Sequence, residues 1–190
     1  MNTNISWNES ATSLKGDVVQ KLYKQKDLLP KDLWWMIHDN CILSGSCASS
    51  IYHKEEPKDY DFWMHDPTKI QWVRDIIIRD YSDYIMDVAA KYGNLSSSQP
   101  LITENAITLV NDFQIITLGD YFSERKKFDY VHCLPYHDLA RNTFYISENQ
   151  LDAIDRKKLV KNPGGREPVA RRQQKFLERG WTLDNDGVLL

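Results

Sequence analysis

Two short apolar runs separated by a polar turn stand out in the first third of the chain. The first covers 42–44 and ends in Gly45-Ser46, and the second covers 59–64. The residues between them, 47–52, are compatible with a short helix. Because apolar runs of this length bounded by turn residues are typical of strands, the pattern predicts strand, turn, short helix and second strand.

Helical and extended patterns continue on both sides of this pair. Apolar positions at helical spacing predict helices over 12–29, 33–38, 69–84, 151–162 (opened by a capping box at 147–150) and 167–179. β-rich runs predict a hairpin of 106–110 with 113–117, a strand over 128–133 and an edge strand over 143–146. We expect a loose tail over 1–11 and a flexible, lid-like loop over 93–100.

This order of elements predicts an α+β fold, with a mixed sheet flanked by helices and a short C-terminal helical appendage. The run Asn162-Pro163-Gly164-Gly165 interrupts the helical pattern near the end. We therefore predict a main domain over 12–146 and a basic helical extension over 147–190.

The second predicted strand carries two carboxylates on one face. Alternate side chains of a strand share a face, so Asp59 and Asp61 point one way while Tyr60, Phe62 and Met64 point into the core. Carboxylate pairs of this kind bind Mg²⁺ together with substrate phosphates. The alternative is a pair that only solvates a strand edge.

Two further features fit phosphate chemistry. The Gly45-Ser46 turn allows close backbone approach and leads into a helix N-terminus, which suits a triphosphate. Asp129 stands alone in an apolar run, where an unpaired carboxylate is costly, so we predict a third metal ligand or base there. The alternative for Asp129 is an ion pair with one of the neighbouring cations Arg125, Lys126 or Lys127.

Composition narrows the class of protein. The 190 residues have a net charge of −3, and no apolar run approaches the length of a membrane span. The polar N-terminus lacks a signal-peptide pattern, and three unpaired cysteines suit a reducing compartment. We expect a cytoplasmic protein that makes no membrane contact. The spacing of His132, Cys133 and His137 matches no zinc pattern, so we interpret them as packed strand residues.

Positive charge is concentrated near the C-terminus. Two acidic residues, Glu167 and Glu178, accompany nine basic ones there: Arg156, Lys157, Lys158, Lys161, Arg166, Arg171, Arg172, Lys175 and Arg179. Such a segment favours a polyanionic partner, with a solvated helix face as the alternative.

The strand, Gly-Ser turn and Asp-x-Asp strand together resemble the signature of the DNA polymerase β-like nucleotidyltransferase superfamily. The resemblance implies that superfamily's fold and the transfer of a nucleoside monophosphate from a nucleoside triphosphate to a hydroxyl, with two Mg²⁺ ions as cofactors. Carried over to this chain, it assigns the metals to Asp59, Asp61 and Asp129 and the nucleotide to Gly45, Ser46 and Ser49.

The C-terminal sequence Arg172-Gln-Gln-Lys175-Phe176, followed by Gly180-Trp181, resembles the segment after the head domain of tRNA CCA-adding enzymes and bacterial poly(A) polymerases. This likeness implies that Arg171, Arg172 and Lys175 contact the triphosphate or steer an acceptor. The group's base-selecting motif is not intact, since Val169 stands where its arginine would fall.

The length of the chain is closest to that of small stand-alone nucleotidyltransferase-like proteins of tailed bacteriophages, which would place it in the host cytoplasm. An RNA 3′ end is the favoured acceptor. Nucleotidylation of a protein hydroxyl, as in small toxin–antitoxin nucleotidyltransferases, is the first alternative. A non-catalytic nucleotide- or nucleic-acid-binding module and a purely structural protein are the others.

Overall fold

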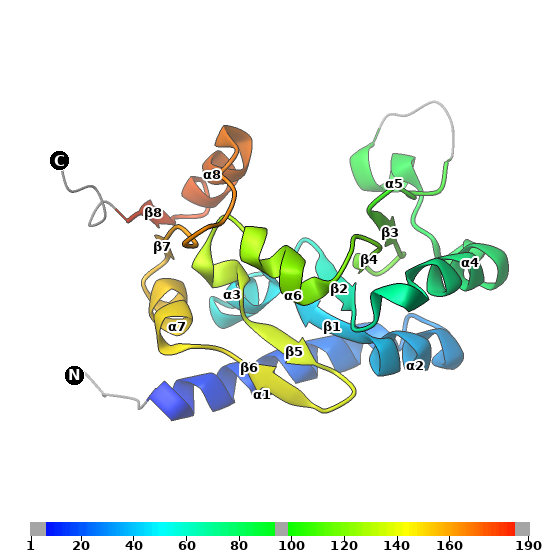
Figure 1. The fold of residues 1–190 in the computed structure, drawn as a ribbon, viewed down its shortest axis with the longest axis horizontal. Helices are drawn as coiled ribbons and strands as arrows, with labels where there is room; N and C mark the ends of the chain where they lie inside the picture. The colour runs from blue at the N-terminus through cyan, green and yellow to red at the C-terminus, as the bar shows by residue number, and fades with distance from the viewer. Residues whose placement is uncertain (1–6, 94–98, 185–190) are drawn as a thin grey trace.

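A six-stranded mixed sheet with helices on both faces forms the body of the protein (Figure 1). The structure, a computed structural model, describes residues 7–93 and 99–184. Most of the predicted 93–100 loop and the first six residues lie outside this part. The α+β class and the mixed sheet are confirmed.

The elements follow one another along the chain. The helices are α1 (Trp7–Lys26), α2 (Lys31–Asn40), α3 (Cys47–Tyr52), α4 (Ile70–Asp80), α5 (Val88–Tyr92), α6 (Tyr121–Glu124), α7 (Glu148–Asp155) and α8 (Ala170–Leu177). The main sheet contains β1 (Cys41–Ser44), β2 (Tyr60–Met64), β3 (Ala106–Thr108), β4 (Phe113–Ile116), β5 (Tyr136–Asp138) and β6 (Thr143–Tyr145). A second, parallel pair joins β7 (Lys158–Leu159) to β8 (Thr182–Leu183).

The sheet order is β3-β4-β2-β1-β5-β6, which places β1 and β2 at its centre. The β2–β4 pair is parallel, and the other neighbours are antiparallel. In the β1–β2 register Ser44 lies opposite Asp61. The predicted Gly-Ser turn therefore begins directly beside the Asp-x-Asp strand.

The two faces of the sheet have different roles. Tyr60, Phe62 and Met64 point into the main core, where they meet α1, α2 and α4. On the other face Trp63 packs with Ile42 and with Tyr121 of α6. Asp59 and Asp61 alternate with the core residues and belong to this second face, as the strand pattern predicts.

Several predicted bounds differ from the observed ones, and one predicted strand is not found among the described residues. Helix α1 begins at Trp7, inside the predicted tail, and α7 ends at Asp155, before a Lys157 with φ of 48°. The predicted 128–133 strand is instead an isolated bridge at Tyr130 followed by a 3₁₀ turn, Val131–Cys133. Its backbone hydrogen bonds go to 160–162, since Val131 N–H donates to the Val160 carbonyl and Asn162 N–H donates to the Asp129 carbonyl. The strand that does pair with β1 there is β5.

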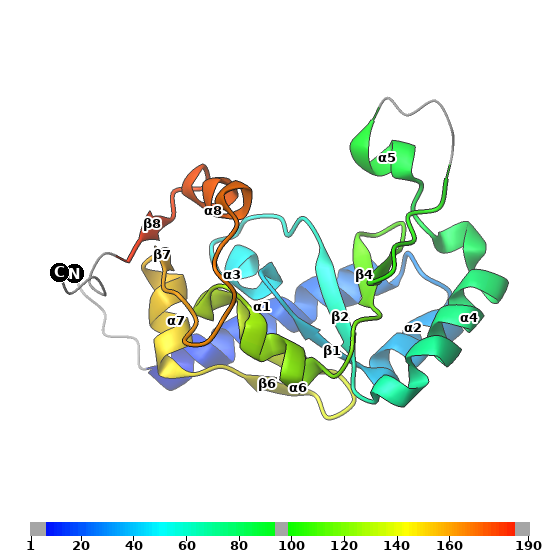
Figure 2. The same ribbon diagram turned by 45° about the horizontal axis from the view of Figure 1, so that its top comes forward.

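The C-terminal elements pack on the main body. Phe176 of α8 and Trp181 are buried in a small cluster with Tyr130 and Leu159, while Leu151 of α7 belongs to the main core. The connection between β7 and α8, residues 160–169, runs alongside α6 and back, and we call it the strap (Figure 2). A division into two domains at residue 146 stays a prediction. Across the described residues, no helix is both long and apolar enough for a bilayer.

Candidate active site

The turn after β1 holds the carboxylate of Asp61 against the backbone of Gly45. Gly45 has φ of 98°, a conformation that L side chains rarely adopt. A Cβ built on Gly45 would lie 2.6 Å from Asp61 Oδ2, so only glycine leaves room for the carboxylate in this position. The Gly45 N–H donates to the Cys133 carbonyl, which fixes the turn against the 3₁₀ turn that follows Asp129.

Asp59 and Asp61 repel each other. Partial burial and the charge of Asp59 raise the pKa of Asp61 well above its usual range. The cations Arg172 and Lys175 oppose that shift without cancelling it. A bound cation would reduce the repulsion between the two carboxylates.

Asp129 lies on the same side of the sheet and is buried. Its Oδ2 accepts an ion-pair contact of 2.6 Å from Arg172 Nε of α8, and its Oδ1 accepts from the Tyr130 N–H at 3.1 Å. An ion pair at Asp129 is thus present, but its partner is Arg172 of the C-terminal helix and not one of the adjacent cations that we considered from the sequence. A second Arg172 nitrogen lies 3.7 Å from Cys133 Sγ.

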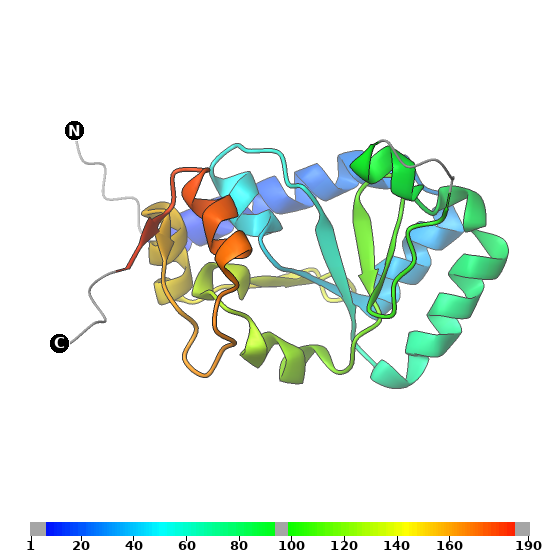
Figure 3. The same cartoon turned by 90° about the horizontal axis from the view of Figure 1, so that it is seen from above.

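The strap is bound to residues 126–128, and α8 follows it in the chain. Asn162 Nδ2 donates to the carbonyls of Lys126 and Phe128, at 3.1 and 2.9 Å. Gly165 lies so close to Phe128 that an added Cβ would come within 2.1 Å of the Phe128 carbonyl oxygen. Viewed from above, α8 lies next to α3, which follows the Gly45 turn (Figure 3). Arg172 of α8 reaches Asp129 from this position.

These contacts leave a pocket of about 320 Å³ between the sheet and the strap. Four of the predicted site residues line it: Gly45, Asp61, Asp129 and Arg172. Arg171 and Lys175 line a neighbouring pocket, together with Arg172. Asp59, Ser46 and Ser49 line neither, and the buried Ser49 hydroxyl donates to the Ser46 carbonyl at 2.8 Å.

The pocket also has walls that we did not predict from the sequence. They are Trp63, Lys127, Phe128, Arg166, Glu167 and Val169. Trp63 could have been found, because it follows Asp61 by two positions on the same strand face. The rings of Trp63 and Phe128 lie 5.5 Å apart, so one side of the pocket is aromatic and the other is charged.

The residues fit a bound cation only in part. Asp59 and Asp61 supply the paired carboxylates that Mg²⁺ prefers. In the part of the chain that the structure describes, however, no three His, Cys, Asp or Glu side chains are grouped to hold a metal. Asp129 is paired with Arg172 instead. The expected three-carboxylate site would require Arg172 to release Asp129.

Most of the basic C-terminal residues are paired with acids. Seven of the nine have a carboxylate partner: Arg156 with Asp152, Lys157 and Arg179 with Glu55, Lys158 with Asp184, Lys161 with Glu167, Arg166 with Glu124, and Arg172 with Asp129. The segment is therefore not a continuous cationic track.

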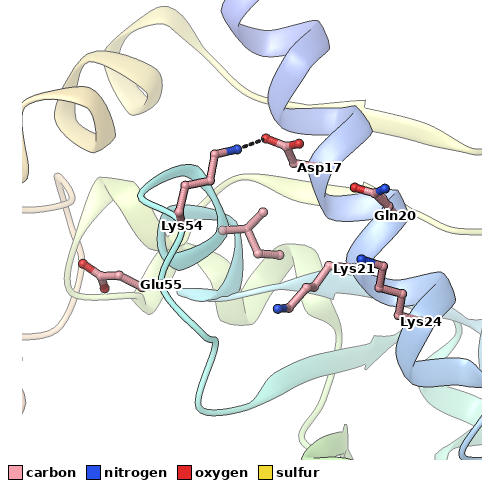
Figure 4. Close-up of a pocket in the computed structure, with 7 residues that line it drawn as sticks. Asp17, Gln20, Lys21, Lys24, Lys54 and Glu55 are labelled. Atoms are coloured by element: carbon pink, nitrogen blue, oxygen red, sulfur yellow. Dashed lines mark hydrogen bonds and ion pairs between the residues drawn. The ribbon is translucent and has the colours of Figure 1, made fainter.

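A further pocket, of about 230 Å³, lies between α1 and residues 51–55. Figure 4 shows its side chains, among them the ion pair of Lys54 with Asp17 at 2.7 Å. None of the predicted site residues lines it.

With the geometry established, comparison with known proteins adds a family. The model described as Gabija anti-defense 2 family protein matches residues 15–157, well over half of the chain. The chain belongs to the Gabija anti-defense 2 family. The match contains Gly45, Asp59, Asp61 and Asp129, while α8 lies beyond its end. No curated protein matches the chain.

Proposed function

We propose that this member of the Gabija anti-defense 2 family is a Mg²⁺-dependent nucleotidyltransferase with a minimal polymerase β-like fold. It would move a nucleoside monophosphate from a nucleoside triphosphate to an acceptor hydroxyl. The observation that carries the proposal is the seating of Asp61 directly on Gly45, with Asp59 beside it on the same strand face. The resemblance to the nucleotidyltransferase signature depends on this juxtaposition of turn and Asp-x-Asp strand.

Each group then has a physical role. Asp59 and Asp61 would hold Mg²⁺, which when bound supplies positive charge to the reacting phosphate. The Gly45 turn allows the triphosphate to approach the backbone, and Ser46 adds a hydroxyl. Arg172 lies within reach of the same pocket and would neutralise phosphate charge once it leaves Asp129.

Asp129 would accept the proton of the acceptor hydroxyl or complete the metal site. Its burial and its position in the same pocket as Asp61 support this role. The aromatic wall of Trp63 and Phe128 offers an apolar surface for a nucleobase.

The family name supplies a biological setting. The family is named for countering Gabija defence, and we propose that nucleotidyl transfer is the reaction by which this chain does so. An RNA 3′ end is the acceptor that we favour, and a protein hydroxyl is the alternative.

Ligand-dependent stability tests this proposal without knowledge of the acceptor. Mg²⁺ with a nucleoside triphosphate at about 100 times its Kd should stabilise the native protein by about 2.7 kcal/mol. For a chain of this size that corresponds to a rise in melting temperature of roughly 5–10 °C. The rise should need both metal and nucleotide and should vanish in Asp61→Asn. If no triphosphate raises the melting temperature, the proposal is wrong.

One observation favours a second candidate, a non-catalytic nucleotide-binding module. The Arg172–Asp129 ion pair occupies the carboxylate that a two-metal mechanism needs. This candidate predicts that nucleotides bind equally well with Mg²⁺ and with EDTA. The nucleotidyltransferase predicts that EDTA abolishes most of the affinity.

A further inference from the structure

A second pocket adjoins the candidate active site. It encloses about 600 Å³ and shares two lining residues, Val169 and Arg172, with the pocket that contains Asp61. Its other walls come from Lys58, Arg171, Gln174, Lys175 and Glu178. Lys58 immediately precedes the predicted metal ligand Asp59 in the chain.

Five charged residues line this pocket, and three of them are cations without a carboxylate at ion-pair distance in the part of the chain that the structure describes: Lys58, Arg171 and Lys175. The other two are Arg172, which is paired with Asp129, and Glu178, which accepts a hydrogen bond from Gln174. Of the nine C-terminal cations, Arg171 and Lys175 are the two without a carboxylate at ion-pair distance among the described residues, and both lie here. Lys58 joins them from the other side. Across the described chain, uncompensated positive charge next to the site is thus gathered in one place.

The cations also repel one another. Partial burial lowers the pKa of Lys175, and Asp59 opposes that shift. The nearby charges of Lys58, Arg172 and Arg179 lower the pKa further. Because like charges are held together at this point, a bound anion would relieve their repulsion.

We propose that this second pocket is the acceptor subsite, and that it binds the last phosphates of a single-stranded RNA 3′ end. The inference rests on the proposed nucleotidyl transfer and names its acceptor class. Arg171 offers the planar donor geometry that suits phosphate, while Lys58 and Lys175 supply point charges. The proposed place of the triphosphate is at Gly45, which lines the adjoining pocket and not this one, so an acceptor here would leave that place free.

The pairing of the other cations limits the length of the contact. Three cations neutralise about three phosphates, and for single strands log K falls with log salt by about 0.7 per phosphate. We therefore expect a slope of about −2. A track that used all nine basic residues would give a slope of about −6.

The test is fluorescence anisotropy of the full chain with a short labelled single-stranded RNA, measured over a series of KCl concentrations without nucleotide. Lys58→Gln, Arg171→Gln and Lys175→Gln should each weaken binding about fivefold at 0.1 M salt and reduce the slope by about 0.7. Lys161→Gln is the matched control, because its cation lies in the same segment but is paired with Glu167. It should leave both affinity and slope unchanged.

Competition separates the acceptor from the triphosphate. If the subsite is distinct, saturating Mg²⁺·ATP leaves the RNA bound. Displacement of RNA by ATP would show that the three cations bind the triphosphate, and it would overturn the inference. A slope near zero, or binding of an acidic peptide in place of RNA with the same response to the three variants, would overturn it in favour of a protein acceptor.

The inference and the proposed function can fail separately. A rise in melting temperature with Mg²⁺·ATP but no RNA binding would leave the transferase standing and remove the RNA subsite. RNA binding without any response to Mg²⁺·ATP would remove the transferase, and with it the acceptor role of the pocket.

Discussion

The candidate site is built by two regions in different ways. The centre of the sheet, β1 and β2, positions the carboxylates through strand alternation, close packing and the positive φ of Gly45. The C-terminal region, from β7 to β8, positions cations through ion pairs and a small aromatic cluster. The first is held by the backbone of a central strand pair, whereas the second combines a few backbone hydrogen bonds with side-chain contacts.

This difference suggests a division of labour. Backbone pairing in the sheet fixes Asp61 whether or not a ligand is present, and Asp59 precedes the same strand by one residue. The ion pair of Arg172 with Asp129 involves a half-exposed arginine, so a competing cation or phosphate can rearrange it. The carboxylates of the sheet are thus held in fixed positions, whereas Arg172 of α8 can change its partner.

The largest effect is expected from Gly45→Ala, which disturbs the turn that holds Asp61. The new Cβ would meet Asp61 Oδ2 at 2.6 Å and would also require φ of 98°. We expect about 1–3 kcal/mol of destabilisation and, because displaced carboxylates misplace the substrate, a loss of about 100-fold in transfer. Gly16→Ala in α1 is the control, since nothing lies within 4 Å of its added Cβ. Equal activity of the two variants would contradict the account.

Arg172→Gln removes the ion pair between α8 and Asp129. It leaves the buried Asp129 without its cation, which should cost roughly 1–3 kcal/mol in urea denaturation without metal. Mg²⁺ should then restore more stability to the variant than to the wild type, because Asp129 becomes available. Arg171→Gln, one residue away and without an ion pair at Asp129, should show no such gain. A metal response that is the same in wild type and Arg172→Gln would mean that the ion pair does not compete with metal.

Acid should weaken the packing of the aromatic cluster around His132. His132 is buried against Phe176 and Trp181, and burial together with the charges of Arg172 and Arg179 lowers its pKa to about 3. In the unfolded chain His132 takes up a proton near pH 6.5, whereas in the native chain it does not. The contribution of the neutral His132 to the free energy of unfolding is therefore fully present above pH 6.5 and is lost as the pH drops towards 3.

The expected contribution of His132 to that slope is about 1.4 kcal/mol per pH unit. His132→Phe, which keeps an aromatic ring in the cluster, should flatten the slope between pH 6 and 4 by this amount. Denaturant titrations at a series of pH values measure it. An unchanged slope in the variant would place the acid sensitivity elsewhere.

The smallest effect is expected at Glu55, which ties the turn after α3 to both Lys157 and Arg179. Because all three side chains are partly buried, Glu55→Gln should cost about 1 kcal/mol in urea denaturation. Glu56→Gln is the control, since its more exposed pair with Lys21 should contribute little. Equal costs for the two variants would mean that Glu55 does not anchor the C-terminal region.

The sequence was sufficient to predict the sheet side of the site. Strand alternation placed Asp59 and Asp61 on one face, and the Gly-Ser turn placed Gly45 beside them, since both depend on neighbouring residues. The hairpin of β3 and β4 was predictable for the same reason.

The C-terminal side was not predictable in this way. Asp129 lies in an apolar run that reads as a strand, but its backbone partners are 160–162, which no local pattern indicates. The pairing of Arg172 with Asp129 likewise depends on how the strap folds back, and hence on Gly165 against Phe128. The number of basic residues in the C-terminal segment likewise does not tell which of them are paired, because pairing depends on which acids lie opposite each cation.

The most direct test of nucleotidyl transfer is incubation of the protein with each α-³²P-labelled nucleoside triphosphate, Mg²⁺, total cellular RNA and protein extract, beside an Asp59→Asn/Asp61→Asn variant. The account predicts that label moves to RNA and falls by more than about 100-fold in the variant, since metal ligands matter more than the second-shell groups whose loss costs that much. Label on protein would keep the transferase and change its acceptor. Absence of label on either, or equal labelling by the variant, would contradict the central claim.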